Sequence, residues 1–194
     1  TMLLALIKQF NWVDILVVIL LLRTSYIAIK NGVFVELFKL LGVLLASYLS
    51  LHYFTNVSDF FEARVPMPPA IPLEIWDFLA FLGLAILGYL IFAILRETFF
   101  RFIKTETVSL LNKWGAVLLG ISRGFILASL VIFFLSIPVI DYFENSVKDS
   151  FSGRRLIKIS PGVYTYFWKN IVSKFKSREE FNKVVLEVQK EIIK

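Results

Sequence analysis

The chain has 194 residues, of which 58% are hydrophobic and only 19% are charged. Soluble domains hold about 45–50% apolar residues, so this balance predicts a membrane domain with a modest polar appendage. The formal net charge is +6, but the basic residues are scattered and form no basic stripe with interleaved aromatics, which argues against nucleic-acid binding. The absence of cysteine excludes thiol catalysis, disulfides and cysteine metal sites.

The first predicted spanning helix covers Trp12–Ile29 and contains one strongly basic residue, Arg23, after eight consecutive aliphatic residues, Ile15–Leu22. An arginine near the centre of a helix costs about 2.5–3.5 kcal/mol on the insertion scale, and each Leu, Ile or Val returns about 0.3–0.6 kcal/mol. The aliphatic residues therefore recover most of the cost. We expect this helix to insert into the bilayer.

A tight turn is predicted at Asn31 and Gly32, because both residue types tolerate the left-handed backbone conformation. The second predicted helix, Val33–Phe54, follows at once, so helices one and two are expected to form an antiparallel hairpin. Gly42 and Ala46 give the second helix a face of small side chains, against which another helix can pack closely.

Residues 55–72 break the helical pattern, because four of the seven residues in 66–72 are prolines. Successive prolines prevent a helix from continuing and favour extended polyproline geometry. The third predicted helix covers Ile75–Leu95. The stretch Glu97–Lys113 then combines basic residues with phenylalanines, which predicts a segment at the membrane interface.

The fourth predicted helix, Trp114–Ile137, carries small side chains at every fourth position, namely Ala116, Gly120, Gly124 and Ala128. On a helix this spacing keeps the small side chains on one narrow face, where another helix backbone can approach closely. One charged residue, Arg123, lies in the first half of this apolar run. The alternative is a buried helix of a soluble protein, but soluble chains seldom contain several such runs.

The segment after Pro138 is polar or amphipathic, in contrast to the long apolar runs before it. We therefore divide the chain into a four-helix transmembrane domain, residues 1–138, and a polar or amphipathic tail, residues 139–194. Within the tail, Asp141–Ser152 is polar and is expected to be irregular or loosely helical. Two amphipathic helices are expected after it. The predicted fold is thus an all-α membrane protein with four transmembrane helices, arranged as two antiparallel hairpins, and a helical tail.

The first tail helix is predicted to have Ser160 as its N-cap and Pro161 at its first helical position. One face of this helix is apolar and holds Tyr164, Phe167, Trp168, Ile171 and Phe175. Such a face fits the headgroup zone of a membrane, or equally a site on the loops of the membrane domain itself. A second helix is predicted to start at Ser177, with Glu180 completing a capping box.

Basic residues are concentrated in the short loops after helices one and three, at Lys30, Arg96, Arg101, Lys104 and Lys113. The N-terminus and the proline-rich loop carry only Lys8 and Arg64. Cytoplasmic loops of membrane proteins carry the excess of Lys and Arg. The pattern therefore favours cytoplasmic loops one and three, with both termini outside the cytoplasm.

Three local patterns occur together in the chain: Trp12-Val13-Asp14, Gly32 followed by Glu36, and Gly115…Gly120…Arg123-Gly124. With these patterns, residues 11–175 resemble the colicin V production protein family (CvpA), which are small proteins of the bacterial inner membrane. The resemblance implies a link to the production or export of a peptide bacteriocin and to envelope integrity. Some relatives carry a trypsin-like protease domain after the membrane part, outside the cytoplasm.

The chain departs from the family pattern beside the turn glycine. A basic residue is usual immediately before that glycine, whereas this chain has Asn31, with Lys30 one position earlier. An aromatic residue is usual after it, whereas this chain has Val33 followed by Phe34. These differences affect the expected contacts of the turn, not the resemblance as a whole.

Three charged residues, Arg23, Glu36 and Arg123, are expected at similar depths in the membrane. With a rise of about 1.5 Å per residue, their Cα atoms lie about 5–12 Å into the core from the cytoplasmic helix ends. Ionisable groups at such depths usually pair or line a watery cavity, so one hypothesis is that Glu36 accepts hydrogen bonds from Arg123, Arg23 or both. The alternative is snorkelling, in which each arginine extends to the phosphates and Glu36 lies at the interface.

The sequence predicts no catalytic, cofactor-binding or metal-binding residues. Asp14 lies at the start of helix one, where the positive end of the helix dipole stabilises a carboxylate; a cation site is the alternative. His52 is the only histidine and has no acidic neighbour at ligand spacing, which argues against a metal site.

We favour a non-enzymatic inner-membrane component that assists bacteriocin or toxin production or export and envelope homeostasis. The alternatives are an oligomeric channel or transporter that uses the charged region, and an intramembrane enzyme. Four short helices rarely enclose a pore alone, so reconstituted protein that stays monomeric and passes no ions or peptides would exclude a channel. The expected partners are the lipid bilayer and either further copies of the chain or other membrane proteins, with no nucleic acid and no metal.

Overall fold

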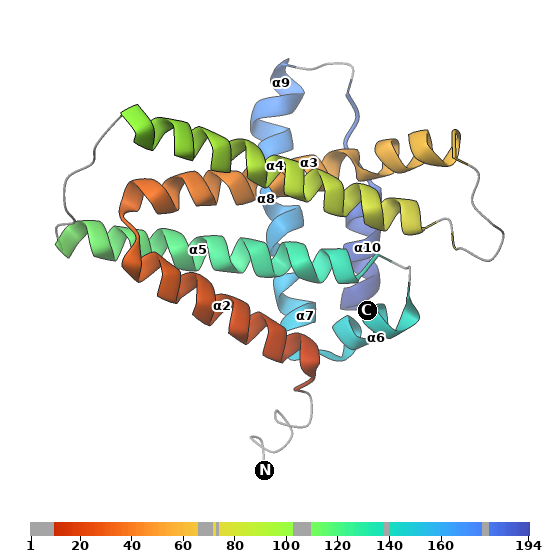
Figure 1. Ribbon diagram of the computed structural model, residues 1–194. Coiled ribbons are helices and arrows are strands. Elements are labelled where there is room, and N and C mark those ends of the chain that lie inside the picture. Colours follow the sequence, from red (N-terminus) through yellow and green to blue (C-terminus); the bar gives the residue numbers. More distant parts are fainter. Residues whose placement is uncertain (1–9, 66–71, 73, 103–109, 138–139, 176–178) are drawn as a thin grey trace, which may run out of the picture.

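The computed structural model describes residues 10–65, 72, 74–102, 110–137, 140–175 and 179–194, and within them the regular elements are all helices. Four of these helices are long and apolar enough to cross a membrane: α2 (Trp12–Lys30), α3 (Val33–Glu62), α4 (Ile75–Phe102) and α5 (Leu110–Leu135). The predicted all-α membrane fold with four long helices is therefore confirmed (Figure 1).

Consecutive long helices run in opposite directions, as expected, but the closest packing is not between the members of each hairpin (Figure 1). α3 packs along most of its length on α4, and α2 packs on α5. α3 also contacts α5, whereas α4 and α5 touch only weakly. The bundle is thus built from two close pairs, α2 with α5 and α3 with α4, that meet along α3 and α5.

Two long helices continue beyond their predicted ends. α3 ends at Glu62 rather than Phe54, because Ser58 is buried and Phe61 stacks on Trp76 of α4 with 5.4 Å between ring centroids. These tertiary contacts keep the polar stretch after Phe54 helical, although its sequence predicts a loop. α4 likewise continues to Phe102, where Phe99 and Phe100 pack on Phe38 of α3.

The small residues of the fourth predicted helix lie against α2. A Cβ atom added to Gly120 would collide with the Cβ atom of Ala28, and one added to Gly124 would lie 2.6 Å from Thr24 Oγ1. Ala116 and Ala128 are both fully buried. Close approach of two helices needs small side chains at the crossing, so this seam holds α2 and α5 together within one chain.

The small residues of α3 lie against α4. A Cβ atom on Gly88 of α4 would lie 2.6 Å from the Cα atom of Ala46 in α3. A Cβ atom on Gly42 would lie 3.2 Å from the Cβ atom of Phe92. Both seams of small side chains are therefore covered by helices of the same chain.

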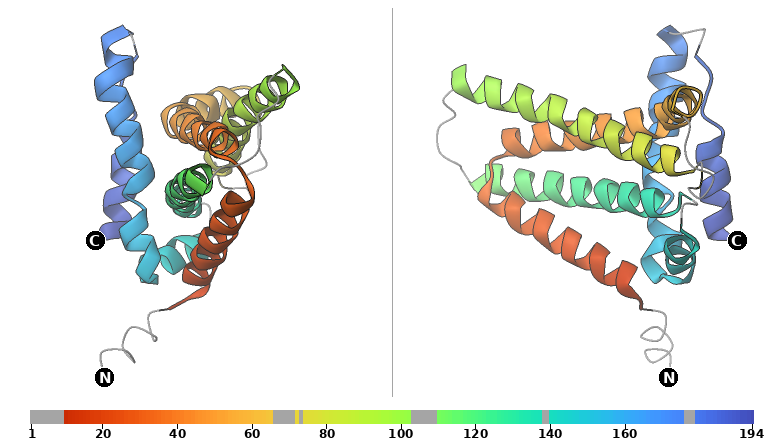
Figure 2. Two further views of the ribbon diagram at one scale, coloured as in Figure 1. Left: turned by 90° about the vertical axis from the view of Figure 1, so that its left-hand side faces the viewer. Right: turned by 45° about the vertical axis from the view of Figure 1, so that its right-hand side comes forward.

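In the described part of the tail, six short helical segments follow the bundle: α6 (Asp141–Asp149), α7 (Phe151–Leu156), α8 (Ile159–Phe167), a π-helical turn η1 (Trp168–Val172), α9 (Ser173–Phe175) and α10 (Val184–Ile193). Segments α7 to α9 run roughly perpendicular to the long helices and cover one side of the bundle (Figure 2). The polar stretch from residue 141 is thus helical, as α6 and α7. The first tail helix was expected in the headgroup zone or on the loops of the membrane domain, whereas α8 packs on the long helices α3 and α5.

Both predicted helix starts in the tail are wrong. α8 begins at Ile159 with Lys158 as its N-cap, and Ser160 instead bonds to α5: its hydroxyl donates to the Ile126 carbonyl at 3.0 Å and its amide donates to Ser129 Oγ at 2.8 Å. A buried hydroxyl next to another helix satisfies its hydrogen bonds there rather than by capping.

The last helix, α10, begins at Val184, so Glu180 precedes it and completes no capping box; Ser177 lies outside the described residues. The side chain of Asn182 accepts a hydrogen bond from the Val184 amide at 3.2 Å. Its own backbone amide donates to Tyr164 of α8 at 3.0 Å. Contacts with α8 therefore hold the residues before Val184 out of the helix.

Tail and bundle share one hydrophobic core. Val147, Ile157 and Val185 of the tail are fully buried in the same cluster as Leu51 and Phe133 of the long helices. The expected domain boundary after residue 138 falls outside the described residues and stays a prediction. The shared core means that the tail helices are stabilised by burial against the bundle.

We predict that Gly88→Ala destabilises the fold, because the added methyl group would force the backbones of α3 and α4 apart. Overpacking of this kind costs about 1–3 kcal/mol, and the free energy of unfolding in detergent micelles measures it. Gly83→Ala in the same helix is the matched control, since a Cβ atom there meets nothing within 4 Å. Equal stability of the two variants would contradict the close α3–α4 packing.

Candidate functional site

A buried ion pair links α3 to α5 inside the bundle. Arg123 Nη2 lies 3.2 Å from Glu36 Oε2, and the side chains are 6% and 0% exposed respectively. The other carboxylate oxygen, Oε1, accepts hydrogen bonds from Asn31 Nδ2 at 2.6 Å and Lys39 Nζ at 3.2 Å. Oε1 is thus hydrogen-bonded twice, whereas Oε2 lies beside the guanidinium without a hydrogen bond among the described residues.

Local sequence places these groups together. Glu36 lies in the first turn of α3, where the helix dipole stabilises a carboxylate. Gly120, one turn before Arg123, lets α2 pack against α5 beside the pair: a Cβ atom there would collide with the Cβ atom of Ala28, whereas it would be in ordinary contact with Glu36 Oε2 at 3.5 Å. Asn112 of α5 accepts the Val33 amide at 2.6 Å and so caps the start of α3.

The turn before α3 has a different backbone from the one expected. Asn31 has φ −96° and ψ 163°, and Gly32 has φ −89° and ψ 167°, so both are extended rather than left-handed. A side chain at Gly32 would instead approach Asn112, whose Nδ2 atom is 3.4 Å from an added Cβ atom. Neither a left-handed conformation nor a steric clash therefore requires a glycine at this position.

Arg23 lies apart from this pair. It is exposed, and within the part of the chain that the structure describes it forms no ion pair with Glu36. The next residue, Thr24, faces α5, and its carbonyl accepts a hydrogen bond from Arg123 Nη2 at 3.5 Å. The structure therefore brings Glu36, Arg123 and Lys39 together. It leaves Arg23 at the rim of an adjoining pocket of about 400 Å³.

At the opposite end of the bundle, Asp14 caps two helices at once. It accepts the Asn11 amide at 3.0 Å, which forms the capping box of α2. It also accepts the Ser152 amide at 2.7 Å and the Phe151 amide at 3.3 Å, at the start of α7. The predicted stabilisation at the start of helix one thus extends to a tail helix more than a hundred residues away in the sequence.

The sequence reasoning missed a second polar cluster, around His52 of α3. His52 Nδ1 lies 2.9 Å from the hydroxyl of Tyr164 in α8, and Nε2 lies 3.3 Å from Glu179 Oε2. His52 is 4% exposed and Tyr164 is fully buried. The partners are more than a hundred residues from His52 in the sequence, so no local spacing could have indicated them.

The hydrogen bonds of Tyr164 assign the direction of this network. The oxygen of Tyr164 accepts a hydrogen bond from the Asn182 amide at 3.0 Å, so the hydroxyl proton is available to donate to His52 Nδ1. His52 then carries its own ring proton on Nε2, which is directed at Glu179. Burial raises the pKa of Tyr164 from its ordinary value of 10.0 to about 12. The neutral Tyr164 hydroxyl therefore makes its full contribution to the free energy of unfolding below about pH 10, and this contribution falls as the pH rises toward 12.

We predict that Glu36→Gln strongly destabilises the protein, because it leaves Arg123 buried without its counter-ion. Removing one partner of a buried pair costs about 3–5 kcal/mol, measurable as the free energy of unfolding in micelles. Glu97→Gln is the control: Glu97 pairs with Arg101 at 3.9 Å, but both side chains are largely exposed. A loss no larger than in this control would show that the buried pair contributes nothing.

We predict that Tyr164→Phe loosens the tail while the four long helices stay folded, since it removes the bonds to His52 and Asn182. Amide hydrogen exchange in α10 should rise, and exchange in α5 should not. Tyr166→Phe is the matched control, because Tyr166 lies on the same helix and is 64% exposed. Unchanged exchange of α10 in the Tyr164 variant would disprove a role of this cluster in tail docking.

A family model described as Colicin V production protein matches residues 13–161 of the chain. Comparison with curated proteins finds no match, and neither does comparison with solved structures. The match covers all four long helices and extends into α8, including Glu36, Arg123 and the buried Ser160. On that extent of agreement, the chain belongs to the colicin V production protein family.

Proposed function

We propose that the protein is a non-enzymatic component of the bacterial inner membrane that assists the production or export of a peptide toxin and supports envelope homeostasis. The observation that carries the proposal is the family match over residues 13–161 on a fold with four apolar, membrane-length helices. Several buried polar residues also join helices to one another: Glu36 with Arg123, Asp14 with α7, and His52 with α8. That use of polar groups supports a scaffold role.

We infer that both termini are extracytoplasmic. Four spans place the two ends of the bundle on one side, and the basic residues at the C-terminal ends of α2 and α4 and in the chain that follows α4 favour a cytoplasmic position for this end of the bundle. Alkaline phosphatase fused after Lys194 should be active in intact cells, and green fluorescent protein fused at that position should not fluoresce. The reverse result would place the C-terminus in the cytoplasm.

We also propose that the protein assembles with a further copy or with another membrane protein. α4 supports this, because among the described residues its close packing is on α3, and it exposes large apolar side chains along its length, including Leu79, Leu87, Ile91 and Ile94. Native mass spectrometry from nanodiscs should show a complex. A uniform monomer, with no protein recovered alongside it under gentle extraction, would refute the proposal.

We predict that deleting the gene in a strain that secretes a colicin V-type peptide lowers the secreted peptide and increases sensitivity to detergent. Bioassay of the culture supernatant and growth on detergent measure the two effects. Expression of the wild-type chain or of Glu97→Gln should restore both, whereas Glu36→Gln should restore neither, because the bundle is destabilised. Normal secretion and normal detergent resistance in the deletion strain would refute the proposed function.

A further inference from the structure

Two neighbouring pockets of the bundle together form what we call the groove, which has one cationic end and one apolar end. The cationic end is the pocket of about 400 Å³ between α2, α3, α4 and α5, and its charged lining residues are Arg23, Lys39 and Arg123. The apolar end is a pocket of about 290 Å³ between α3, α4 and α5. Val43, Tyr89 and Leu127 line both pockets, so the two spaces adjoin.

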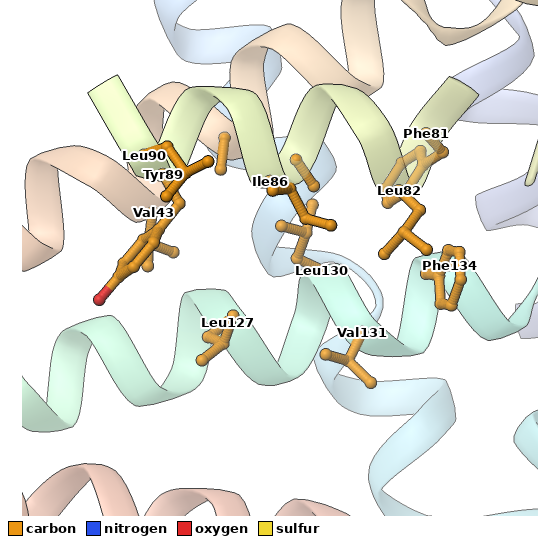
Figure 3. Close-up of a pocket in the computed structure, with 12 residues that line it drawn as sticks. Val43, Phe81, Leu82, Ile86, Tyr89, Leu90, Leu127, Leu130, Val131 and Phe134 are labelled. Carbon is orange, nitrogen blue, oxygen red and sulfur yellow. The ribbon is translucent and has the colours of Figure 1, made fainter. Parts of the chain in front are cut away.

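The apolar part has the shape of a slot. Side chains of α4, such as Leu82 and Ile86, face Leu127 and Val131 of α5 across it (Figure 3). From Leu127 to Phe134 the slot extends about 10 Å along α5, at about 1.5 Å per residue. Stacked phenylalanines lie at its far end, where Phe81 and Phe134 have ring centroids 5.9 Å apart.

The groove lies on a different side of the bundle from the tail. α8 bonds to α5 through Ser129 and Ile126, whereas Leu127 and Val131, which line the groove, lie on another face of that helix. Segments α7 to α9 cover one side of the bundle, and the opposite side, between α2 and α4, carries none of them (Figure 2). The contact between α4 and α5 is weak, so these two helices do not close the slot between them.

Charge at the polar end is only partly compensated. Three cations line it, and the carboxylate beside them is Glu36, which already pairs with Arg123 and Lys39. The Nε atom of Arg123 is buried without a hydrogen-bond partner among the described residues, and Arg23 forms no ion pair there. Uncompensated cations at membrane depth are costly, so an anion in this pocket would be favoured.

From this geometry we propose that the groove binds an anionic phospholipid of the surrounding bilayer. The phosphate occupies the pocket of Arg23, Lys39 and Arg123, and one acyl chain lies in the slot between α4 and α5. Arginine and lysine heads supply charge-assisted hydrogen bonds to the phosphate oxygens, and the apolar slot removes the chain from contact with other lipids. The site does not rest on the proposed role in export.

The test uses purified, delipidated protein and two lipids with identical acyl chains, phosphatidylglycerol and phosphatidylcholine. Native mass spectrometry and thermal unfolding should show that phosphatidylglycerol binds more tightly and stabilises the protein more. Arg23→Gln should weaken phosphatidylglycerol binding about ten-fold, the effect of losing one charge-assisted hydrogen bond. Lys30→Gln is the matched control, because Lys30 lies on the same helix outside the pocket.

Two further arms separate the lipid from other occupants. Ala85→Phe fills the slot and should weaken phosphatidylglycerol binding without touching the cations. Glycerol phosphate, which has the headgroup charge without acyl chains, should not stabilise the protein. Equal binding of both lipids, equal effects of Arg23→Gln and Lys30→Gln, stabilisation by glycerol phosphate alone, or a dimer that Ala85→Phe converts to monomer would each overturn the proposal.

Discussion

The arrangement of the long helices depends on the pairing of Glu36 with Arg123. Neither charge is tolerable alone in the interior of a membrane bundle, because the low dielectric makes an unpaired ion costly. Their 3.2 Å contact requires the start of α3 to lie beside the middle of α5. Gly120, one turn before Arg123, lets α2 approach the same region of α5, since a Cβ atom there would collide with that of Ala28. One ionic contact thus sets the position of three helices.

The opposite end of the bundle is organised by hydrogen bonds between helices distant in sequence. Asp14 caps α2 and α7 together, and His52 links α3 to Tyr164 and Glu179 of the tail. The tail is therefore part of the folded unit, bound to one side of the bundle, while the side with the cationic groove carries none of the segments α7 to α9 (Figure 2). This asymmetry gives the protein one face closed by its own chain and one face available to the membrane or to a partner.

Much of the fold followed from patterns within single helices. Apolar runs of membrane length predicted α2 to α5, and the four-residue spacing of small side chains in the fourth helix marked the face that packs on α2. The predicted helix boundaries in the tail were wrong where the hydrogen-bond partner of a residue lies on another helix. Ser160 has the chemistry of an N-cap, but Ser129 and Ile126 of α5 satisfy it instead.

Hydropathy, small-residue spacing and the local patterns around Gly32 and Arg123 are properties of neighbouring residues, so the sequence by itself determined the membrane class, the long helices and the family. Which charges meet is a matter of distance between helices, and only the tertiary structure decided it. Rotation of α2 by one residue would have directed Arg23 rather than Thr24 at α5. The same holds for His52, whose partners come together only after the tail crosses the bundle.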